Sequence, residues 1–367
     1  MIENTRSFDP DVYEGRRIRL QESLRSDGLA GALITSKANR IYYTGFGPDS
    51  GSLNRFVALC VPAEGEVTYV VSDIDKDRTT QVGVRTLPAA YGEGVRLAAD
   101  TISDWEAGEL AVESGELTLL AAEAIRLATD RVLAHADIYL ATLRSVKTAE
   151  EIEVLRIASR HTDAVAKEAR NLIREGMTER ELSGSMVQFA MSRGCDISQV
   201  PLVLTGERAM FPHLLPSDRE FRSGELVVVD YGVGFGGYET DICRTYSIGE
   251  PSSFAVELHG IVSEAYDAAL KAAQPGNTAE DVHIAAYEVI EKAGYGRYFI
   301  HGVGHGVGIE SHEPPLLSFG QKTPLRDGMV LAIEPGIYTQ GIGLRLENNV
   351  VVRHGGGQSL NDAPMHL

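Results

Sequence analysis

The chain has 367 residues, of which 43% are hydrophobic and 23% charged, as is typical of a soluble globular protein with two or three domains. Lys and Arg total 34 against 52 Asp and Glu, so the formal net charge is −18. This acidity argues against nucleic acid or an anionic membrane as the main partner, because both attract basic surfaces.

The cysteines and the first residues indicate a cellular compartment. Cys60, Cys195 and Cys243 lie far apart and are odd in number, which excludes a disulfide framework and fits a reducing cytoplasm. Residues 1–17 are polar and charged, so we expect no signal peptide. No apolar run approaches the ~18 residues of a membrane span, so we expect no such span.

Short apolar runs alternate with helical patterns over residues 1–143, which predicts an α/β layer domain. Apolar runs bounded by Gly, Pro or Asp predict three strands, at residues 27–36, 55–62 and 67–72. Helical spacing predicts two helices, at residues 11–26 and 118–129. Residues 41–54 are rich in Gly, Ser and Asn and are expected to form a loop. The two tyrosines in this loop either pack beneath a surface loop or overhang an active site.

A second domain is expected over residues 144–367. Thr148 and Glu151 have the spacing of a capping box, in which the Thr hydroxyl accepts from a backbone N–H and the Glu reaches back. Apolar residues then recur at helical spacing until Gly176. This pattern predicts the opening helix of the domain.

The second domain contains an internal repeat. The segments that begin at Gly176 and Gly276 both place an acid three residues after a Thr, which is typical of a helix start. Both predicted helices stop at a glycine, Gly194 or Gly294, again 100 residues apart. The sequence therefore predicts two related halves.

Each half also carries two acids in register. An Arg-x-Gly-x5-acid-x-Gly pattern occurs twice at an offset of 104 residues, and its acid, Asp230 or Glu334, ends an apolar strand. Asp241 and Glu347 follow as the second acids. Four buried carboxylates at one centre could not all stay ionised, but two divalent cations would cancel their charge. The repeat thus predicts a dinuclear metal site, with separate salt bridges or surface acids as the alternative.

Histidines supply a further candidate ligand. Four glycines within residues 301–308 argue against a helix, and in an extended chain His301 and His305 lie ~13 Å apart. One of them is expected to bind metal and the other to shape the pocket. His213 and His312 lie one residue off the 100-residue offset, so they either flank the site from the two halves or are solvated loop residues.

These residues resemble a known family, the pita-bread metallopeptidases of the methionine aminopeptidase, prolidase and aminopeptidase P superfamily. The similarity lies in five segments: VVVDYG, ETDICRTY, HGVGHGVGIESHEPP, AIEPGIY and LRLENNVVV. The closest group is that of the Xaa-Pro dipeptidases, or prolidases. Residues 1–143 resemble the creatinase-type N-terminal domain through NRIYYTGF. The resemblance implies an α/β (α+β) chain whose second domain, residues 144–367, is a pita-bread domain with pseudo-two-fold symmetry.

The resemblance also implies metal ligands. They are Asp230, Asp241, His305, Glu334 and Glu347. Asp241 and Glu347 would bridge two divalent ions, Asp230 would complete the shell of one, and His305 with Glu334 that of the other. This donor set suits Mn, Co, Zn or Fe, of which we expect Mn.

Further residues match substrate-binding positions of the family, namely His213, His301, His312 and Arg345. Arg345 would hold a ligand carboxylate or meet a substrate carboxylate. Two close cations would activate a water that attacks the scissile carbonyl. Glu334 would serve as general base and then acid, and His213 or His312 would stabilise the oxyanion.

Cys243 departs from the threonine or other small residue that the family usually has there. It lies two residues after Asp241, and residues i and i+2 of a strand share a face. The thiol therefore either faces the metals or is a small packed residue.

The resemblance implies a homodimeric peptidase that cleaves Xaa-Pro bonds in proline-containing dipeptides or short peptides. The cysteines and the acidity indicate a cytoplasmic protein without nucleic acid or membrane partners. The segment at residues 301–315 favours an Xaa-Pro dipeptidase over an Xaa-Pro aminopeptidase. A creatinase-like C–N hydrolase and an inactive binding module are the alternatives. Such relatives tend to lack ligands, whereas all five are present here.

Overall fold

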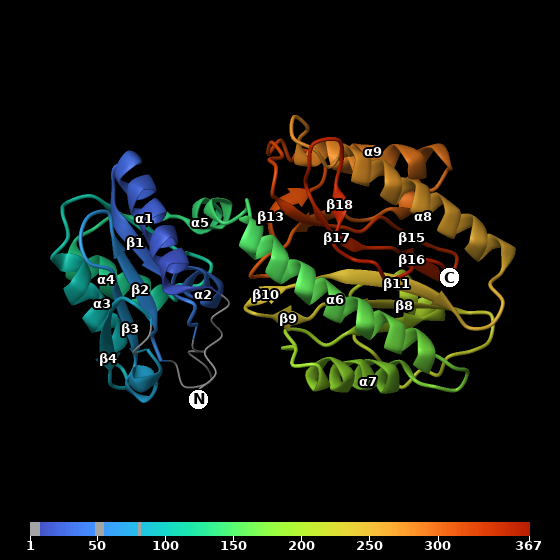
Figure 1. Ribbon diagram of the computed structural model, residues 1–367, viewed down its shortest axis with the longest axis horizontal. Coiled ribbons are helices and arrows are strands. Elements are labelled where there is room, and N and C mark those ends of the chain that lie inside the picture. Colours follow the sequence, from blue (N-terminus) through green and yellow to red (C-terminus); the bar gives the residue numbers. More distant parts are fainter. Residues whose placement is uncertain (1–7, 48–54, 80–81) are drawn as a thin grey trace. The chain divides into compact units, whose positions relative to one another are not determined.

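The computed structural model describes residues 8–47, 55–79 and 82–367. The chain divides into two compact units, Met1–Leu143 and Arg144–Leu367 (Figure 1). Within the described ranges, no helix combines the length and the apolar character that crossing a bilayer requires.

The first unit is built on a six-stranded mixed sheet with the order β4-β3-β2-β1-β5-β6. Its strands are β1 (Leu29–Ile34), β2 (Ala58–Pro62), β3 (Thr68–Ser72), β4 (Arg85–Ala89), β5 (Glu109–Val112) and β6 (Leu133–His135). Its helices are α1 (Pro10–Ser26), α2 (Lys37–Thr44), α3 (Gly94–Ser103), α4 (Leu119–Thr129) and α5 (Asp137–Leu143). The three predicted strands and the two predicted helices of this unit are confirmed.

The predicted loop at residues 41–54 is partly wrong, because its first four residues belong to α2. The Ser36 hydroxyl caps α2 by accepting from the Asn39 N–H at 3.1 Å, and Gly45, with φ of 69°, ends the helix. Tyr42 and Tyr43 are both buried and form an edge-to-face pair, so their apolar area favours the helix over a loop. The rest of the prediction reaches into residues 48–54, which lie outside the described residues.

The second unit contains two helix pairs and several small sheets. Its helices are α6 (Ala149–Leu172), α7 (Glu179–Ser192), α8 (Ser253–Ala272) and α9 (Ala279–Lys292). The strands of its first half are β7 (Leu202–Thr205), β8 (Leu226–Tyr231), β9 (Gly234–Phe235), β10 (Tyr238–Glu239) and β11 (Ile242–Ser247). Those of its second half are β12 (Gly304–Gly306), β13 (Glu313–Leu317), β14 (Val330–Ile333), β15 (Gly336–Thr339), β16 (Ile342–Arg345), β17 (Asn348–Val351) and β18 (Gln358–Ser359).

The capping boxes confirm the predicted helix starts. Thr148, Thr178 and Thr278 each accept from the backbone N–H three residues on, and the acid there bonds back to the Thr backbone N–H. Helices α7 and α9 have 14 residues each and begin 100 residues apart, as the repeat predicts. Helix α6 ends at Leu172, four residues before Gly176.

The two halves of this unit have separate cores. Helices α6 and α7 pack on the sheet β11-β8-β7 through residues such as Val165 and Val229. Helices α8 and α9 pack on the strands of the second half through residues such as Val262 and Leu331. Figure 1 shows α8 and α9 on one side of these strands and α7 on the other. The last residues of β8 and β14 and the first residues of β11 and β17 lie next to the residues that cluster between the two halves.

Candidate metal centre

Four carboxylates occupy strand ends in the two halves of the second unit. Asp230 is the penultimate residue of β8, Asp241 immediately precedes β11, Glu334 follows β14, and Glu347 lies between β16 and β17. The backbone N–H of Glu347 donates to the carbonyl of Cys243 at 3.1 Å, which joins the second half to β11 of the first. The four acids that the sequence repeat places at strand ends therefore lie close together in the folded unit.

The five side chains that the sequence suggested as ligands are brought together. Their donor atoms fall into groups whose members lie within 4.8 Å of one another; these groups contain Asp230, Asp241, His305, Glu334, Glu347 and also His312. The Nε2 atom of His305 lies 3.6 Å from Glu334 Oε1 and 3.9 Å from Asp241 Oδ2. His305 sits in the extended strand β12, as the glycines around it predict.

Burial and mutual repulsion shape the electrostatics of this cluster. Burial, reinforced by the neighbouring carboxylates, raises the pKa of Asp241 and of Glu347 well above the usual range. Burial raises the pKa of Glu334 to about 7, although the Arg345 guanidinium opposes that shift. Burial lowers the pKa of His305 to about 4, so its imidazole is neutral at physiological pH.

The cluster fits divalent cations. Its carboxyl groups, once ionised, carry more negative charge than the guanidinium of Arg345 balances, and among the described residues the buried Oδ1 atom of Asp241 has no hydrogen-bond partner. A neutral imidazole and carboxylate oxygens together suit metals such as Mn, Co, Fe and Zn.

Arg345, which is almost fully buried, ties the cluster to a neighbouring tyrosine. Its Nη2 atom donates to Asp230, its Nε lies 3.8 Å from Glu334 Oε2, and its Nη1 donates to the Tyr338 hydroxyl at 2.8 Å. His301 Nε2 lies 2.9 Å from the same hydroxyl, and His301 Nδ1 lies 2.6 Å from the carbonyl of Gly302. Both ring nitrogens of His301 therefore have partners within the protein.

A cavity of about 330 Å³ opens onto the cluster. Its lining residues are Gln199, Leu202, His213, Asp230, Asp241, His305, His312, Glu334, Arg345 and Glu347. The exposed His213 and His312 thus lie at the same cavity from the two halves, as their offset suggested. The His312 ring stacks on that of His305 with centroids 3.9 Å apart. His301 is not among the lining residues.

Sequence reasoning missed three residues of this site. Gln199 and Leu202 line the cavity, and Leu202 is placed there because it pairs with Asp230 across β7 and β8. No sequence signal marked either of them. Tyr338 lies within the AIEPGIY segment, but its role as the partner of Arg345 depends on the β15–β16 hairpin, which no spacing rule predicts.

A buried ion network supports the segment that carries His312. The Glu313 carboxylate lies 3.1 Å from Arg144 Nε and 3.1 Å from Lys147 Nζ, and it accepts from the backbone N–H of Ile309 at 2.9 Å. Burial favours a raised pKa, but the charges of Lys147 and Arg144 hold the pKa of Glu313 below its usual value. The carboxylate is therefore ionised, and its contacts hold Glu313, the residue that follows His312, in place.

Glu313→Gln should lower the free energy of unfolding by about 3–5 kcal/mol, because it removes the counter-charge of the buried Lys147 and one of the two acids, Glu310 and Glu313, that pair with Arg144. Urea unfolding measures this cost. The control is Asp327→Asn, which breaks the exposed ion pair with Arg353 and should cost no more than about 1 kcal/mol. Equal effects of the two substitutions would contradict the prediction.

Cys243 is a fully buried residue that packs against Leu204, Ala209 and Val228. The groups of described residues that could hold an ion do not include it. Burial raises the pKa of its thiol well above the usual value, even though Arg345 lies nearby and opposes the shift. This environment favours the packed residue over the metal-facing thiolate.

Cys243→Thr should therefore leave inhibition by Zn²⁺ and inactivation by peroxide unchanged, because the thiol is protonated and completely buried. Both are measured as the loss of peptidase activity in wild type and variant. A variant that resists either agent would place the thiol at the metals.

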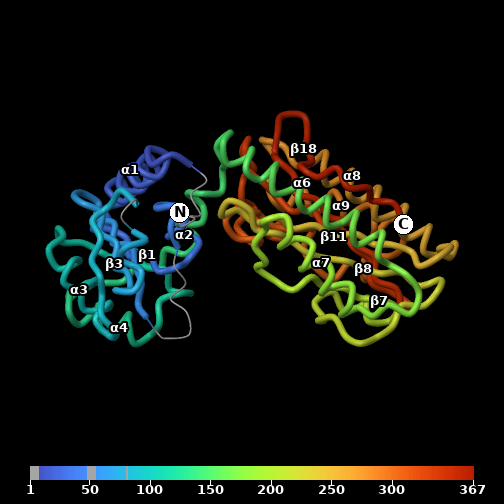
Figure 2. Tube along the Cα trace, turned by 60° about the horizontal axis from the view of Figure 1, so that its bottom comes forward, coloured from blue at the N-terminus to red at the C-terminus, as the bar shows by residue number. Residues whose placement is uncertain are grey.

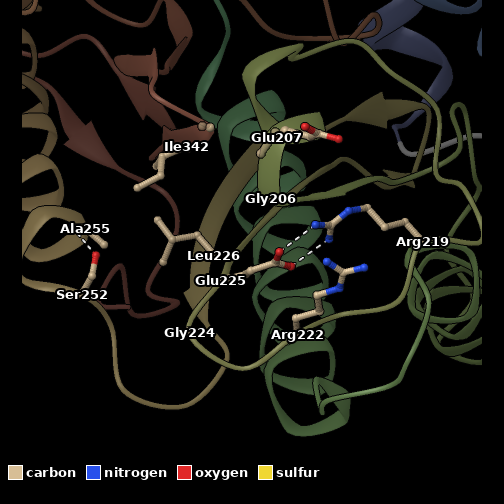
Figure 3. Close-up of a pocket in the computed structure, with 13 residues that line it drawn as sticks. Gly206, Glu207, Arg219, Arg222, Gly224, Glu225, Leu226, Ser252, Ala255 and Ile342 are labelled. Carbon is tan, nitrogen blue, oxygen red and sulfur yellow. Dashed lines mark hydrogen bonds and ion pairs between the residues drawn. The ribbon is translucent and has the colours of Figure 1, made fainter.

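A second cavity, also of about 330 Å³, lies at the opposite end of β8 (Figure 3). Arg219 donates to both carboxylate oxygens of Glu225, at 2.8 and 2.7 Å, and the Ser252 hydroxyl caps α8 by accepting from the Ala255 N–H. Because the charge of Glu225 and the hydroxyl of Ser252 are satisfied within the fold, we place the chemistry in the cavity at the acid cluster.

Comparison with known proteins identifies a domain family for each of the two parts of the chain. The profile of metallopeptidase family M24 matches residues 153–354, and that of the creatinase/prolidase N-terminal domain matches residues 16–146. The probable dipeptidase PepE of Mycobacterium tuberculosis is 34% identical over 376 residues, covering 99% of this chain and 98% of that protein.

Further relatives carry prolidase names. The Xaa-Pro dipeptidase of Pyrococcus furiosus is 38% identical over 233 residues, covering 63% of this chain and 67% of that protein. The crystal structure of the prolidase from Thermococcus sibiricus superposes with a TM-score of 0.90 at 33% identity, covering 97% of this chain and 98% of that one. The predicted fold class is thereby confirmed, and the family implies divalent metal ions at the acid cluster. The chain belongs to metallopeptidase family M24 and begins with a creatinase/prolidase-type N-terminal domain.

Proposed function

We propose that this protein is a dinuclear metal-dependent peptidase that hydrolyses Xaa-Pro bonds and acts mainly as an Xaa-Pro dipeptidase. The observation that carries the proposal is the buried cluster of carboxylates with one neutral imidazole at a cavity of about 330 Å³. A cavity of this size, at the lower end of the range for ligand pockets, suits a dipeptide or a short peptide. The names of the relatives from Pyrococcus and Thermococcus support the Xaa-Pro preference.

The proposed ligands are the five that the sequence suggested: Asp230, Asp241, His305, Glu334 and Glu347. Asp241, Glu347 and His305 each belong to two of the overlapping groups. Of these three, the two carboxylates have two oxygens each, which supports two ions bridged by Asp241 and Glu347. Mn²⁺ is the proposed metal, and Co²⁺, Zn²⁺ and Fe²⁺ suit the same donors. We assign the catalytic domain to residues 144–367 and the creatinase-like domain to residues 1–143, in keeping with the two compact units.

The cations, when bound, supply Lewis acidity and lower the pKa of water. Glu334 lines the cavity, where its carboxylate can take a proton from the attacking water and later give it to the leaving nitrogen. His213 and His312 face the cavity from opposite halves and donate N–H groups to the oxyanion. Arg345 holds Asp230 in place, and His301 acts on Arg345 through the Tyr338 hydroxyl.

The residue after the scissile bond is proposed to be proline. A proline at that position has no backbone N–H, so a peptidase that recognises its substrate through this N–H binds an Xaa-Pro bond poorly. A cavity whose wall includes the apolar side chain of Leu202 offers a surface for the pyrrolidine ring. We further propose that the protein is cytoplasmic, with neither nucleic acid nor membrane as a partner, in keeping with the buried free cysteines and the net charge of −18. The resemblance to the family is the ground for proposing a homodimer.

Three substrates distinguish the proposal from its alternatives. Metal-stripped protein is given Mn²⁺ or Co²⁺ and tested on Ala-Pro, Ala-Pro-Ala and creatine. We expect metal-dependent hydrolysis of Ala-Pro and much slower release of Ala from the tripeptide. Preference for the tripeptide would indicate an Xaa-Pro aminopeptidase, and hydrolysis of creatine a C–N hydrolase. An inert protein would favour the binding module.

A further inference from the structure

We infer that residues 361–364, here called the terminal latch, position the carboxylates of Asp241 and Glu347 for metal binding. The latch lies among α6, β11 and the strands of the second half (Figure 2). It reaches Asp241 through Asn349 and Glu347 through Arg244, so that one segment controls both proposed bridging ligands. The inference rests on the proposed function only in taking these two residues as ligands.

Asn349 clamps the backbone of Asp241. Its Oδ1 atom accepts from the Asp241 N–H at 3.2 Å, and its Nδ2 atom donates to the Asp241 carbonyl at 2.8 Å. The Asn349 side chain is completely buried in β17, opposite Ala332 of β14. A single amide thereby substitutes for a strand neighbour at the residue just before β11 begins. The clamp sets the position from which the Asp241 carboxylate projects into the cluster.

Asn361 of the latch holds this clamp. Its Oδ1 atom accepts from both the backbone N–H of Asn349, at 3.0 Å, and the Asn349 Nδ2, at 3.1 Å. Its own Nδ2 donates to Asp163 of α6 at 3.1 Å, and the N–H of Asp362 donates to the same carboxylate at 2.8 Å. Asn361 thus orients the Asn349 amide. Because the Oδ1 atom of Asn361 is an acceptor, the Nδ2 group of Asn349 must point toward it.

Arg244 makes the second connection, to Glu347. The guanidinium is buried and donates to the carbonyls of Cys243 at 2.9 Å and of Glu347 at 2.5 Å. On its other side it donates to the carbonyls of Ala363 at 2.9 Å and Pro364 at 3.1 Å. A fifth contact goes to Asn348 Oδ1 at 2.7 Å. A guanidinium has five N–H donors, so these five contacts to neutral oxygens use them all.

The physical need for such a device follows from the charge of the cluster. The carboxylates of Asp241 and Glu347 lie close to each other and to those of Asp230 and Glu334, so like charges repel there until cations are bound. Partners that orient metal-binding side chains typically change metal affinity by about 10–100-fold. The latch supplies this orientation without contributing a ligand.

The test compares substitutions at one latch residue. Asn361→Ala removes the acceptor for Asn349, whereas Asn361→Asp keeps that acceptor but repels Asp163. The control is Arg170→Gln, because Arg170 donates to the carbonyls of His366 and Leu367 just beyond the latch and contacts no proposed ligand. Metal-free proteins are titrated with Mn²⁺ against a competing chelator, well below the unfolding temperature of each apoprotein.

We expect Asn361→Ala to weaken Mn²⁺ binding by about 10–100-fold. Asn361→Asp should weaken it much less, and Arg170→Gln should match wild type. Wild-type affinity in Asn361→Ala would overturn the inference. An equal loss in Asn361→Asp would do the same, since it would assign the effect to the tether on α6, and so would an equal loss in the control.

A second variant covers the case in which Asn361→Ala does not fold. Arg244→Lys keeps the buried charge but offers three N–H donors in place of five, and it should also weaken Mn²⁺ binding. If neither variant folds at saturating Mn²⁺, the latch is needed for the fold itself and the inference is wrong. A wild-type protein that binds no Mn²⁺ would instead contradict the proposed function, so the two failures are distinguishable.

Discussion

Asp241→Asn should cost the enzyme its metal and lower its peptidase activity by about 10³-fold or more, since bound cations supply several kcal/mol of transition-state stabilisation. The substitution keeps the shape of the side chain but removes one of the two charges proposed to bridge the ions. The Asp241 side chain is buried, and its carboxylate lies within 4.8 Å of donor atoms of Asp230 and Glu347. Chelation of the wild-type protein should have the same effect, and about two ions per chain should reverse it.

Metal analysis and the turnover of Ala-Pro check this result. The matched control is Asp218→Asn, an identical chemical change at an exposed residue that pairs with Arg180 on the surface. This control should keep both metal and activity. Full activity in exhaustively chelated, metal-analysed protein would exclude the metallopeptidase mechanism.

His312→Ala and His213→Ala should each lower kcat by about 10²–10³-fold, the usual cost of losing an oxyanion donor. Both side chains line the cavity, and neither is one of the proposed ligands. Metal content should therefore stay at the wild-type level in both variants.

His312 makes this a demanding test. Its donor atom lies within 4.8 Å of those of Asp241 and His305, and its ring stacks on that of His305. Loss of metal in His312→Ala would make His312 a ligand. His354→Ala, at an exposed residue that does not line the cavity, is the control and should change neither quantity.

Features that depend on short stretches of chain could be predicted from the sequence. The capping boxes at Thr148, Thr178 and Thr278 form as predicted because their bonds join residues only three apart. Glycines around His305 keep that segment extended for the same local reason. The loop prediction failed at Tyr42 and Tyr43, because burial of the two rings outweighed the local composition.

The sequence by itself determined the two-fold repeat and the strand-end positions of the four acids, since an offset of about 100 residues is visible without coordinates. It left His301 and His305 open as their companion, and the resemblance to the family selected His305. Only the tertiary structure decided how these side chains are held. The Arg345 guanidinium donates to Asp230, which is 115 residues away in the sequence. Asn361 forms hydrogen bonds with Asn349 of β17 and Asp163 of α6. Such partners come from side-chain packing between separate strands and helices, and no periodicity in the sequence records which polar atoms will meet when those elements close on one another.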